Sequence, residues 1–316
     1  MRSGMAQLLH RPDGFGVGEV VRWLGAVQAQ DTAAAALAFR ARMAGVTPAD
    51  IDAAVERREI VRAWGPRNTL HYVHRDDLGW LLALTSRRLG SMRRLREEGV
   101  EGDDLLELIT GALDGQGPLT KAELEERLGG RARGQGVVHL VSLAAARGLA
   151  VLGPDRGRKP TYVHTADWLG APIRFEPDLG RALGELALRY ARSHRPAEPA
   201  DFAAWSGLSL GEARKMWINP EKWQEEPPIT RLLPAFDEIL LGWKSRDPIL
   251  PAEHARTIFP GGGILRPAVF TDGRVTGTWS RKATTITVTP FDGTQRIPPA
   301  ELDDVTRFLT QVAASR

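Results

Sequence analysis

Two glutamines separated by one alanine are the most distinctive chemical feature of the sequence. Gln28 and Gln30 lie in the run VQAQD, residues 27–31, between the end of one predicted helix and the start of the next. In an extended segment, residues i and i+2 project to the same side, so both carboxamides would face one small volume. A carboxamide holds water through its carbonyl oxygen and donates through its NH₂ group, although it takes up no proton at neutral pH. The pair therefore indicates a place where water could be oriented, although two surface glutamines are the simpler interpretation of the spacing alone.

The more common catalytic arrangements are missing from the sequence. Without cysteines, the chain has no disulfides, thiolate zinc sites or cysteine nucleophiles. The run 261–263 is three glycines without the lysine and Ser/Thr of a P-loop, and is interpreted as a turn. His71 and His74 are expected on opposite faces of a strand, so they should not share a metal. For Asp237 and Glu238, a structural salt bridge is favoured over acid–base work. We expect no metal and no cofactor.

The elements around the glutamines predict a winged helix. Apolar residues recur at helical spacing over 17–27, and Asp31 can cap an alanine-rich helix after the glutamines. A third helix is expected over 48–56, because it begins with a proline. Strand-like runs at 60–64 and 69–73 then flank a turn. Three helices followed by a two-stranded wing form the winged variant of the helix-turn-helix.

This order of elements returns further along the chain. After one long helix predicted from about Asp76 to Glu98, two further units are expected, with capping boxes at Thr120 and Ser209. Strands and turns dominate near the C-terminus, and disorder is expected only in the first dozen residues. The predicted fold is mainly α with β (α+β). Its expected segments are a first winged helix over 1–98, a second over 99–172, a third winged-helix-like unit over 173–228 and a β-rich C-terminal element over 229–316.

Composition and charge favour a soluble protein with a polyanionic partner. The 316 residues are 42% hydrophobic and 26% charged, which is ordinary for a globular protein. No stretch approaches the ~20 apolar residues that span a bilayer, and the start has no apolar signal core, so a cytoplasmic location is expected. The net charge is only +3, but the cations are nearly all arginine, which suits phosphates. Arginine-rich clusters occur at Arg87, Arg88, Arg93, Arg94 and Arg96, at Arg131 and Arg133, and at Arg156, Arg158 and Lys159. They fit either a solvated surface or a nucleic-acid partner.

Four runs of the sequence resemble the AlkZ-type DNA glycosylases, which are often described as winged-helix DNA-binding proteins. The run VQAQDTAAAALAFRARM is similar to the family signature and VRAWGPRNTLHYV to its first wing. RLLPAFDEILLGWKSRD resembles the junction segment of the family, and GGGILRPAVFTDGRVTGTWS its late hairpin. The resemblance spans nearly the whole chain in order. It implies tandem winged helices that form a C-shaped DNA cradle.

The resemblance also implies an activity. The glutamine–apolar–glutamine motif of the family corresponds to Gln28, Ala29 and Gln30, which would be catalytic. A sister branch carries aspartate at the second glutamine, so this chain resembles the crosslink-resistance branch linked to alkylating natural products. The implied enzyme is a monomeric, monofunctional bacterial DNA glycosylase that removes N7-alkylated purines from double-stranded DNA. Bulky adducts and interstrand crosslinks would be candidate substrates, in self-resistance or base-excision repair, within the cytoplasm at the nucleoid and away from membranes.

DNA contacts are expected on the wings and on the arginine clusters, while Trp64 is expected in the core. The candidate DNA-binding residues are Arg62, Arg67, Asn68, His71, Arg87, Arg88, Arg156 and Arg158. For His71, a structural role in the wing is an equal alternative. Two non-enzymatic functions compete with the glycosylase: a winged-helix transcriptional regulator, which would usually dimerise on a two-fold operator, and a nucleic-acid scaffold that has lost catalysis.

Overall fold

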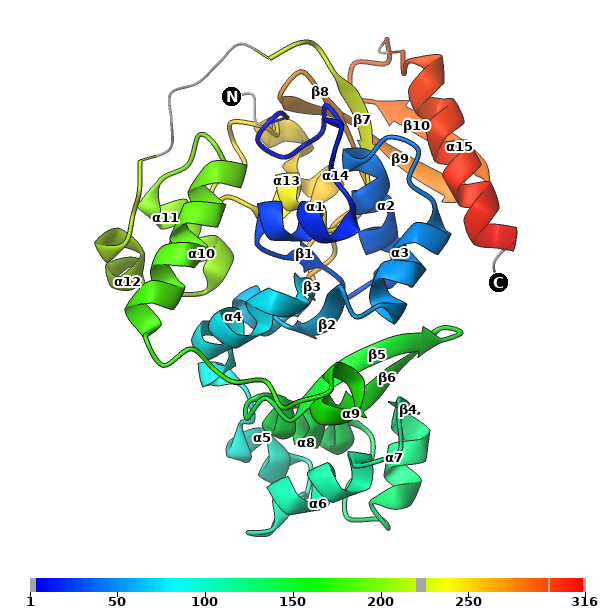
Figure 1. The fold of residues 1–316 in the computed structure, drawn as a ribbon. Coiled ribbons are helices and arrows are strands. Elements are labelled where there is room, and N and C mark those ends of the chain that lie inside the picture. Colours follow the sequence, from blue (N-terminus) through cyan, green and yellow to red (C-terminus); the bar gives the residue numbers. More distant parts are fainter. Residues whose placement is uncertain (1–3, 220–225, 295, 315–316) are drawn as a thin grey trace. The chain divides into compact units, whose positions relative to one another are not determined.

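The computed structural model describes residues 4–219, 226–294 and 296–314, and it has a mixed α/β fold (Figure 1). The predicted fold class, mainly α with β (α+β), is confirmed, since the structure combines many helices with antiparallel sheets. None of the helices in the described residues has the length and apolar character needed to cross a bilayer. The chain forms two compact units: unit 1 comprises Met1–Ile51 and Gly184–Arg316, and unit 2 comprises Asp52–Leu183. Unit 1 thus contains both the N-terminal and the C-terminal segments of the chain. The division into four consecutive segments stays a prediction.

Unit 1 combines helices from both ends of the chain with an antiparallel sheet in the order β10-β9-β8-β7. The last helix, α15, contacts the edge strands β7 and β10, and α2 contacts β7 (Figure 1). The N-terminal elements are α1 (Val17–Leu24), β1 (Val27–Gln28), α2 (Thr32–Arg42) and α3 (Pro48–Glu56), whose end lies in unit 2. The later elements are α10 (Leu179–Ser193), which begins in unit 2, α11 (Pro199–Ser206), α12 (Leu210–Lys215), β7 (Thr230–Leu233), α13 (Glu238–Leu241), α14 (Ala255–Ile258), β8 (Ala268–Thr271), β9 (Arg274–Lys282), β10 (Thr285–Pro290) and α15 (Pro299–Ala314).

The beginning of the chain is part of the core of unit 1. Leu9 is fully buried and packs in one cluster with residues from the sheet, among them Leu233 and Phe270. The Gln7 side chain is also buried, and its Nε2 donates to the Ser193 carbonyl over 2.7 Å. The expectation of a disordered first dozen residues is therefore wrong for this described part, because its apolar and polar groups both find partners from distant segments.

Two buried arginines anchor the C-terminal end of α2. Arg40 Nη1 donates to Glu301 at 2.8 Å and to Asp304 at 3.0 Å, both on α15. Arg42 forms a two-pronged pair with Asp237, with both N–O distances at 2.8 Å and both side chains fully buried. The structural salt bridge favoured for Asp237 is thus confirmed. Such pairs fix geometry strongly, because a buried charge without its partner is very costly.

Unit 2 contains two antiparallel hairpins, and its strands follow the order β3-β2-β5-β6-β4. Helices α6, α7 and α8 pack together beside the second hairpin (Figure 1). The first hairpin consists of β2 (Ile60–Trp64) and β3 (Leu70–His74), followed by α4 (Leu78–Thr85) and α5 (Met92–Glu97). The second part consists of α6 (Leu105–Leu113), β4 (Leu119–Thr120), α7 (Lys121–Arg127), α8 (Gln135–Ala145), β5 (Ala150–Arg156), β6 (Lys159–His164) and α9 (Thr165–Leu169). Trp64 lies in the apolar core of this unit, as expected.

The long helix predicted from Asp76 to Glu98 is wrong, because the structure breaks it at Gly90. This residue has φ +67°, a left-handed conformation that glycine adopts without steric cost. A Cβ on Gly90 would also approach Leu143 to 3.0 Å. Ser91 then caps the new helix α5, where its hydroxyl accepts from the Arg94 amide over 3.4 Å. Helical spacing alone does not reveal such a break when apolar residues continue on both sides of it.

Candidate active site

The glutamine segment connects α1 to α2 within unit 1. Helix α1 ends at Gly25, whose φ of +87° turns the chain out of the helix and into β1. Val27 and Ala29 are buried, whereas Gln28 is half-buried and Gln30 is exposed. This alternation is that of an extended segment, with both glutamines on the side opposite the core. The local geometry therefore agrees with the sequence-based expectation for the segment.

The carbonyl oxygen of the Gln28 side chain is buried and unsatisfied. Its Oε1 has no hydrogen-bond partner among the residues that the structure describes. A buried acceptor without a partner costs roughly 1–3 kcal/mol, and such groups are rare unless water or a ligand satisfies them. Gln28 thus presents an acceptor to which a water molecule or a substrate group can donate.

The carboxylates that could compete for a catalytic role are committed to structure. Asp31 caps α2, with its Oδ1 accepting from the amides of Ala33 at 2.9 Å and Ala34 at 3.1 Å. Asp237 is held in its buried pair with Arg42. An aspartate at an N-cap stabilises the helix start and holds the preceding residues in place. The cap of Asp31 therefore fixes the end of the glutamine segment.

The turn of the first wing carries two consecutive residues in the left-handed region. Arg67 and Asn68 have φ values of +56° and +58°, and both are half-exposed. Non-glycine residues adopt this conformation at a cost of order 1–3 kcal/mol, and such strain clusters at functional sites. The tight turn is closed by a hydrogen bond from the Gly65 amide to the Thr69 carbonyl over 2.9 Å. The closed turn thus fixes the backbone from which the Arg67 and Asn68 side chains project.

Two of the predicted DNA contacts in the first wing are buried. Arg62 is only 5% exposed and pairs with Asp155, from Nη2 to Oδ1 over 2.5 Å and from Nη1 to Oδ2 over 3.2 Å. His71 is fully buried, and its Nδ1 lies 2.9 Å from the Thr69 carbonyl oxygen. Burial does not favour direct DNA contact by either side chain. No pattern in the sequence marks Asp155 as the partner of Arg62, because 93 positions separate the two.

The second wing and α4–α5 present exposed cations. Arg158 and Arg87 are exposed. Arg156 is 56% exposed and donates to Glu123 over 2.5 Å and to the Pro118 carbonyl over 2.7 Å. Hydrogen bonds from Thr120, and then the one from Arg156, lower the pKa of the Glu123 carboxyl to about 2. Arg156 is therefore partly neutralised, whereas no acidic partner of Arg158 that would weaken its attraction for phosphate is found among the described residues. The Arg88 side chain lies outside the described part of the structure.

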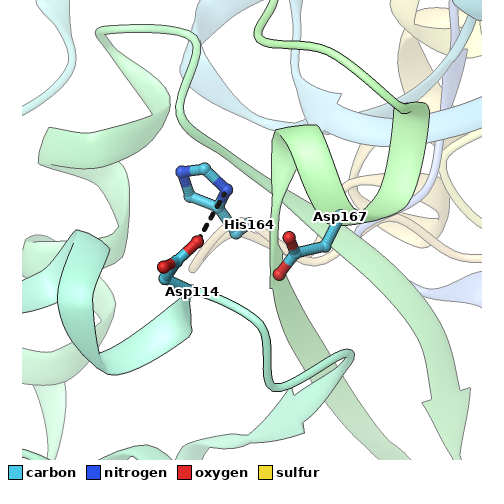
Figure 2. Close-up of side chains that lie close together, drawn as sticks. All are labelled: Asp114, His164 and Asp167. Atoms are coloured by element: carbon cyan, nitrogen blue, oxygen red, sulfur yellow. Dashed lines mark ion pairs between the residues drawn. The ribbon is translucent and has the colours of Figure 1, made fainter.

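One group of side chains that could bind a metal ion is found among the described residues, near the corner between β6 and α9 (Figure 2). Its members are Asp114, His164 and Asp167. His164 Nδ1 lies 4.0 Å from Asp114 Oδ1, and Asp114 is 75% exposed. The third member, Asp167, accepts a hydrogen bond from the Gly115 amide over 2.8 Å. These contacts are those of a weak ion pair and a capped turn. We therefore assign no metal-binding role to this group.

A sequence model described as "DNA glycosylase AlkZ-like" matches residues 21–313, which is most of the chain and includes both glutamines. The chain belongs to the AlkZ-like DNA glycosylase family. A curated relative, the interstrand DNA cross-link repair glycosylase of Streptomyces sahachiroi, is 30% identical over 321 residues, covering 89% of this chain and 86% of the relative. This AlkZ-like chain is therefore a DNA glycosylase, and the regulator and scaffold alternatives are not favoured.

The fold of the AlkZ-like chain also matches a solved structure. The Streptomyces sahachiroi DNA glycosylase AlkZ superposes with a TM-score of 0.80 and 26% sequence identity, covering 98% of this chain and 95% of the other. The match extends over both units and confirms the resemblance that the sequence runs indicated.

Proposed function

We propose that this AlkZ-like glycosylase hydrolyses the N-glycosidic bond of N7-alkylated purines in double-stranded DNA, acting as a monomer on nucleoid DNA. Gln28 and Gln30 are its proposed catalytic residues. The observation that carries the proposal is the buried Oε1 of Gln28 within the family-like segment, which has no hydrogen-bond partner in the described part of the chain. It is supported by the structural commitment of Asp31 and Asp237, which leaves the carboxamides as the groups suited to hold water.

Two glutamines suffice when the leaving group is already activated. A purine alkylated at N7 carries a positive charge and departs without being protonated. Oriented carboxamide dipoles then stabilise the oxocarbenium-like sugar and direct water to the anomeric carbon. Most glycosidases need a carboxylic acid because their substrates are uncharged, so the leaving group would depart as an anion if it were not protonated. A site without such an acid should leave normal purines intact, because it cannot protonate them. The lack of an acid therefore makes the enzyme selective for cationic, alkylated purines.

Bulky adducts and interstrand crosslinks are the proposed substrate class, in self-resistance or alkylation repair. The relative from Streptomyces sahachiroi is named for crosslink repair. A crosslinked purine cannot easily rotate into a snug base pocket, so an enzyme that grips the backbone beside the lesion avoids that requirement. Residues 27–31 contain no lysine that could form a Schiff base. The product should therefore be an intact strand with an abasic site.

Leaving-group chemistry tests the proposed function directly. Single-turnover reactions on matched duplexes should release N7-methylguanine and leave hypoxanthine and 8-oxoguanine in place, because only the first base leaves as a neutral molecule without a proton. Abasic sites are read as alkali-labile breaks. Breaks without alkali, or efficient removal of hypoxanthine, would contradict a monofunctional enzyme that lacks a general acid.

DNA binding should be electrostatic and independent of sequence. Arg67→Ala and Arg158→Ala should each weaken binding to all duplexes about equally and lower the slope of log K against log salt by ~1, the loss of one phosphate contact. Fluorescence anisotropy at several salt concentrations measures both quantities. Arg57→Ala is the matched control, because this exposed arginine already pairs with Glu59 at 2.9 Å. A single tight operator that resists salt would instead indicate a sequence-reading protein.

A further inference from the structure

We infer that Arg189 and Arg192 of α10 are positioning residues, which fix the glutamine segment by holding the C-terminal end of α1. The inference rests on the proposed function of Gln28 and Gln30. Its own content is structural: two cations from one helix bind the last carbonyl groups of the helix that leads into those glutamines.

The contacts are made to carbonyl oxygens in the last turn of α1. The Arg22 carbonyl accepts from Arg189 Nη1 and from Arg192 Nη2, each over 3.2 Å. The Trp23 carbonyl accepts from Arg192 Nη2 over 3.3 Å. The last carbonyls of a helix have no partner within that helix, and cations there are favoured by the helix dipole. The two guanidinium groups thus replace the missing helical turn.

Each guanidinium is itself held in place. Arg189 is only 8% exposed, and its Nε donates to Glu185 one turn earlier on α10 over 2.6 Å. The Arg192 guanidinium lies 4.2 Å from the centre of the Trp23 ring, and the Trp23 Nε1 donates to the Ala6 carbonyl over 2.7 Å. A cation stacked on an indole and fixed by hydrogen bonds has little freedom. Arg189 and Arg192, together called the arginine clamp, therefore hold the C-terminal end of α1 in a fixed position.

The link from the clamp to the glutamines is short and packed. Gly25, Ala26 and Val27 are all buried, and Gln28 follows directly. A Cβ on Gly25 would lie 3.6 Å from Trp205 and 3.9 Å from the Cβ of Arg189, so this turn lies against α10 and α11. Burial and the charge of Arg189 lower the pKa of Arg192 from its usual value. Two cations are thus concentrated, against their mutual repulsion, at the helix end that determines where Gln28 lies.

Removal of either arginine should slow the chemical step more than it weakens DNA binding. With Arg189→Ala or Arg192→Ala, we expect the single-turnover excision rate at saturating enzyme to fall about 10- to 100-fold, the scale of a small misplacement of reacting groups. The Kd for undamaged duplex should change less than about twofold, since neither contact is to phosphate. Guanidinium ion at non-denaturing concentration should partly restore Arg192→Ala, whereas sodium chloride of equal ionic strength should not. Arg214→Ala, which removes an exposed arginine of α12, is the matched control.

A second measurement keeps the clamp testable without activity. Amide hydrogen exchange in residues 26–31 should accelerate in both variants, while exchange within α2 and the urea midpoint stay near those of the wild type. If the wild type excises nothing, the proposed function fails, yet faster exchange confined to 26–31 still supports the clamp. Unchanged exchange there, unchanged excision rates, or a rate loss that merely follows a loss of global stability would overturn the inference.

Discussion

Replacing Gln28 and Gln30 together with alanine is expected to abolish excision of N7-methylguanine while the protein stays folded. Gln30 is exposed and Gln28 is only half-buried, and neither side chain belongs to the apolar core, so their truncation should cost little stability. At position 30, aspartate should be tolerated better than alanine, because it keeps an oxygen acceptor for water and adds a charge that favours the oxocarbenium ion. Gln30→Leu should be poor despite its similar size, since leucine has no polar atom.

The size of the effect decides between the carboxamides and other groups. A ~100-fold rate difference between Gln30→Asp and Gln30→Leu corresponds to ~2.7 kcal/mol of transition-state stabilisation, which suits one or two oriented dipoles. Single-turnover rates of the wild type and these variants on one duplex provide the comparison, and circular dichroism checks folding. Equal rates for aspartate and leucine, or activity in the double alanine variant, would contradict the assignment of the two carboxamides as the catalytic groups.

The second large effect is expected in stability, from Asp237→Ala. This change leaves the guanidinium of Arg42 fully buried without its carboxylate, and its remaining hydrogen bonds go to two neutral acceptors, Gln7 Oε1 and the Ala38 carbonyl, each over 3.1 Å. Breaking a buried pair in this way costs roughly 3–5 kcal/mol, much more than the pair itself contributes. We expect the free energy of unfolding, measured in urea, to fall by that amount.

Two controls separate the buried charge from the loss of a contact. The double variant Arg42→Met with Asp237→Leu removes both charges and should recover most of the lost stability, because apolar residues of similar size often replace a buried pair without penalty. Glu59→Ala breaks the exposed pair with Arg57 and should cost at most ~1 kcal/mol. A similar loss from Asp237→Ala and from Glu59→Ala would show that Arg42 gains access to water in the variant.

Local chemistry made much of the fold predictable from the sequence. The capping boxes at Thr120 and Ser209 are present, with each hydroxyl accepting from the amide three residues later. The Asp31 cap and the start of α3 at Pro48 are also confirmed. These signals are readable because residues within one helical turn determine them. The position of the two glutamines between helices followed from the same signals.

Partners that lie far apart in the sequence were not predictable. From the sequence, Arg62 is predicted to be a DNA-contacting cation of the wing, but in the structure it pairs with Asp155. Arg40 and Arg42 of the alanine-rich helix are both buried, because their acidic partners come from residues 195 or more positions away. The clamp from α10 onto α1 left no trace in the sequence either. In each case, a generic arginine gains its role only from tertiary packing.

The interrupted course of unit 1 along the chain has a consequence for synthesis on the ribosome. Residues 52–183 form one continuous unit, whereas the helix after the glutamines is anchored by Glu301 and Asp304, which lie 261 and 264 positions after Arg40. Domains generally fold as they emerge, N-terminal parts first. Unit 2 can therefore fold before residues 184–316, with which the first 51 residues form unit 1, have been synthesised. Hydrolytic competence would then arise only after Glu301 and Asp304 have been synthesised, so that a polypeptide terminated before them would hold DNA through its wings without cutting a base from it.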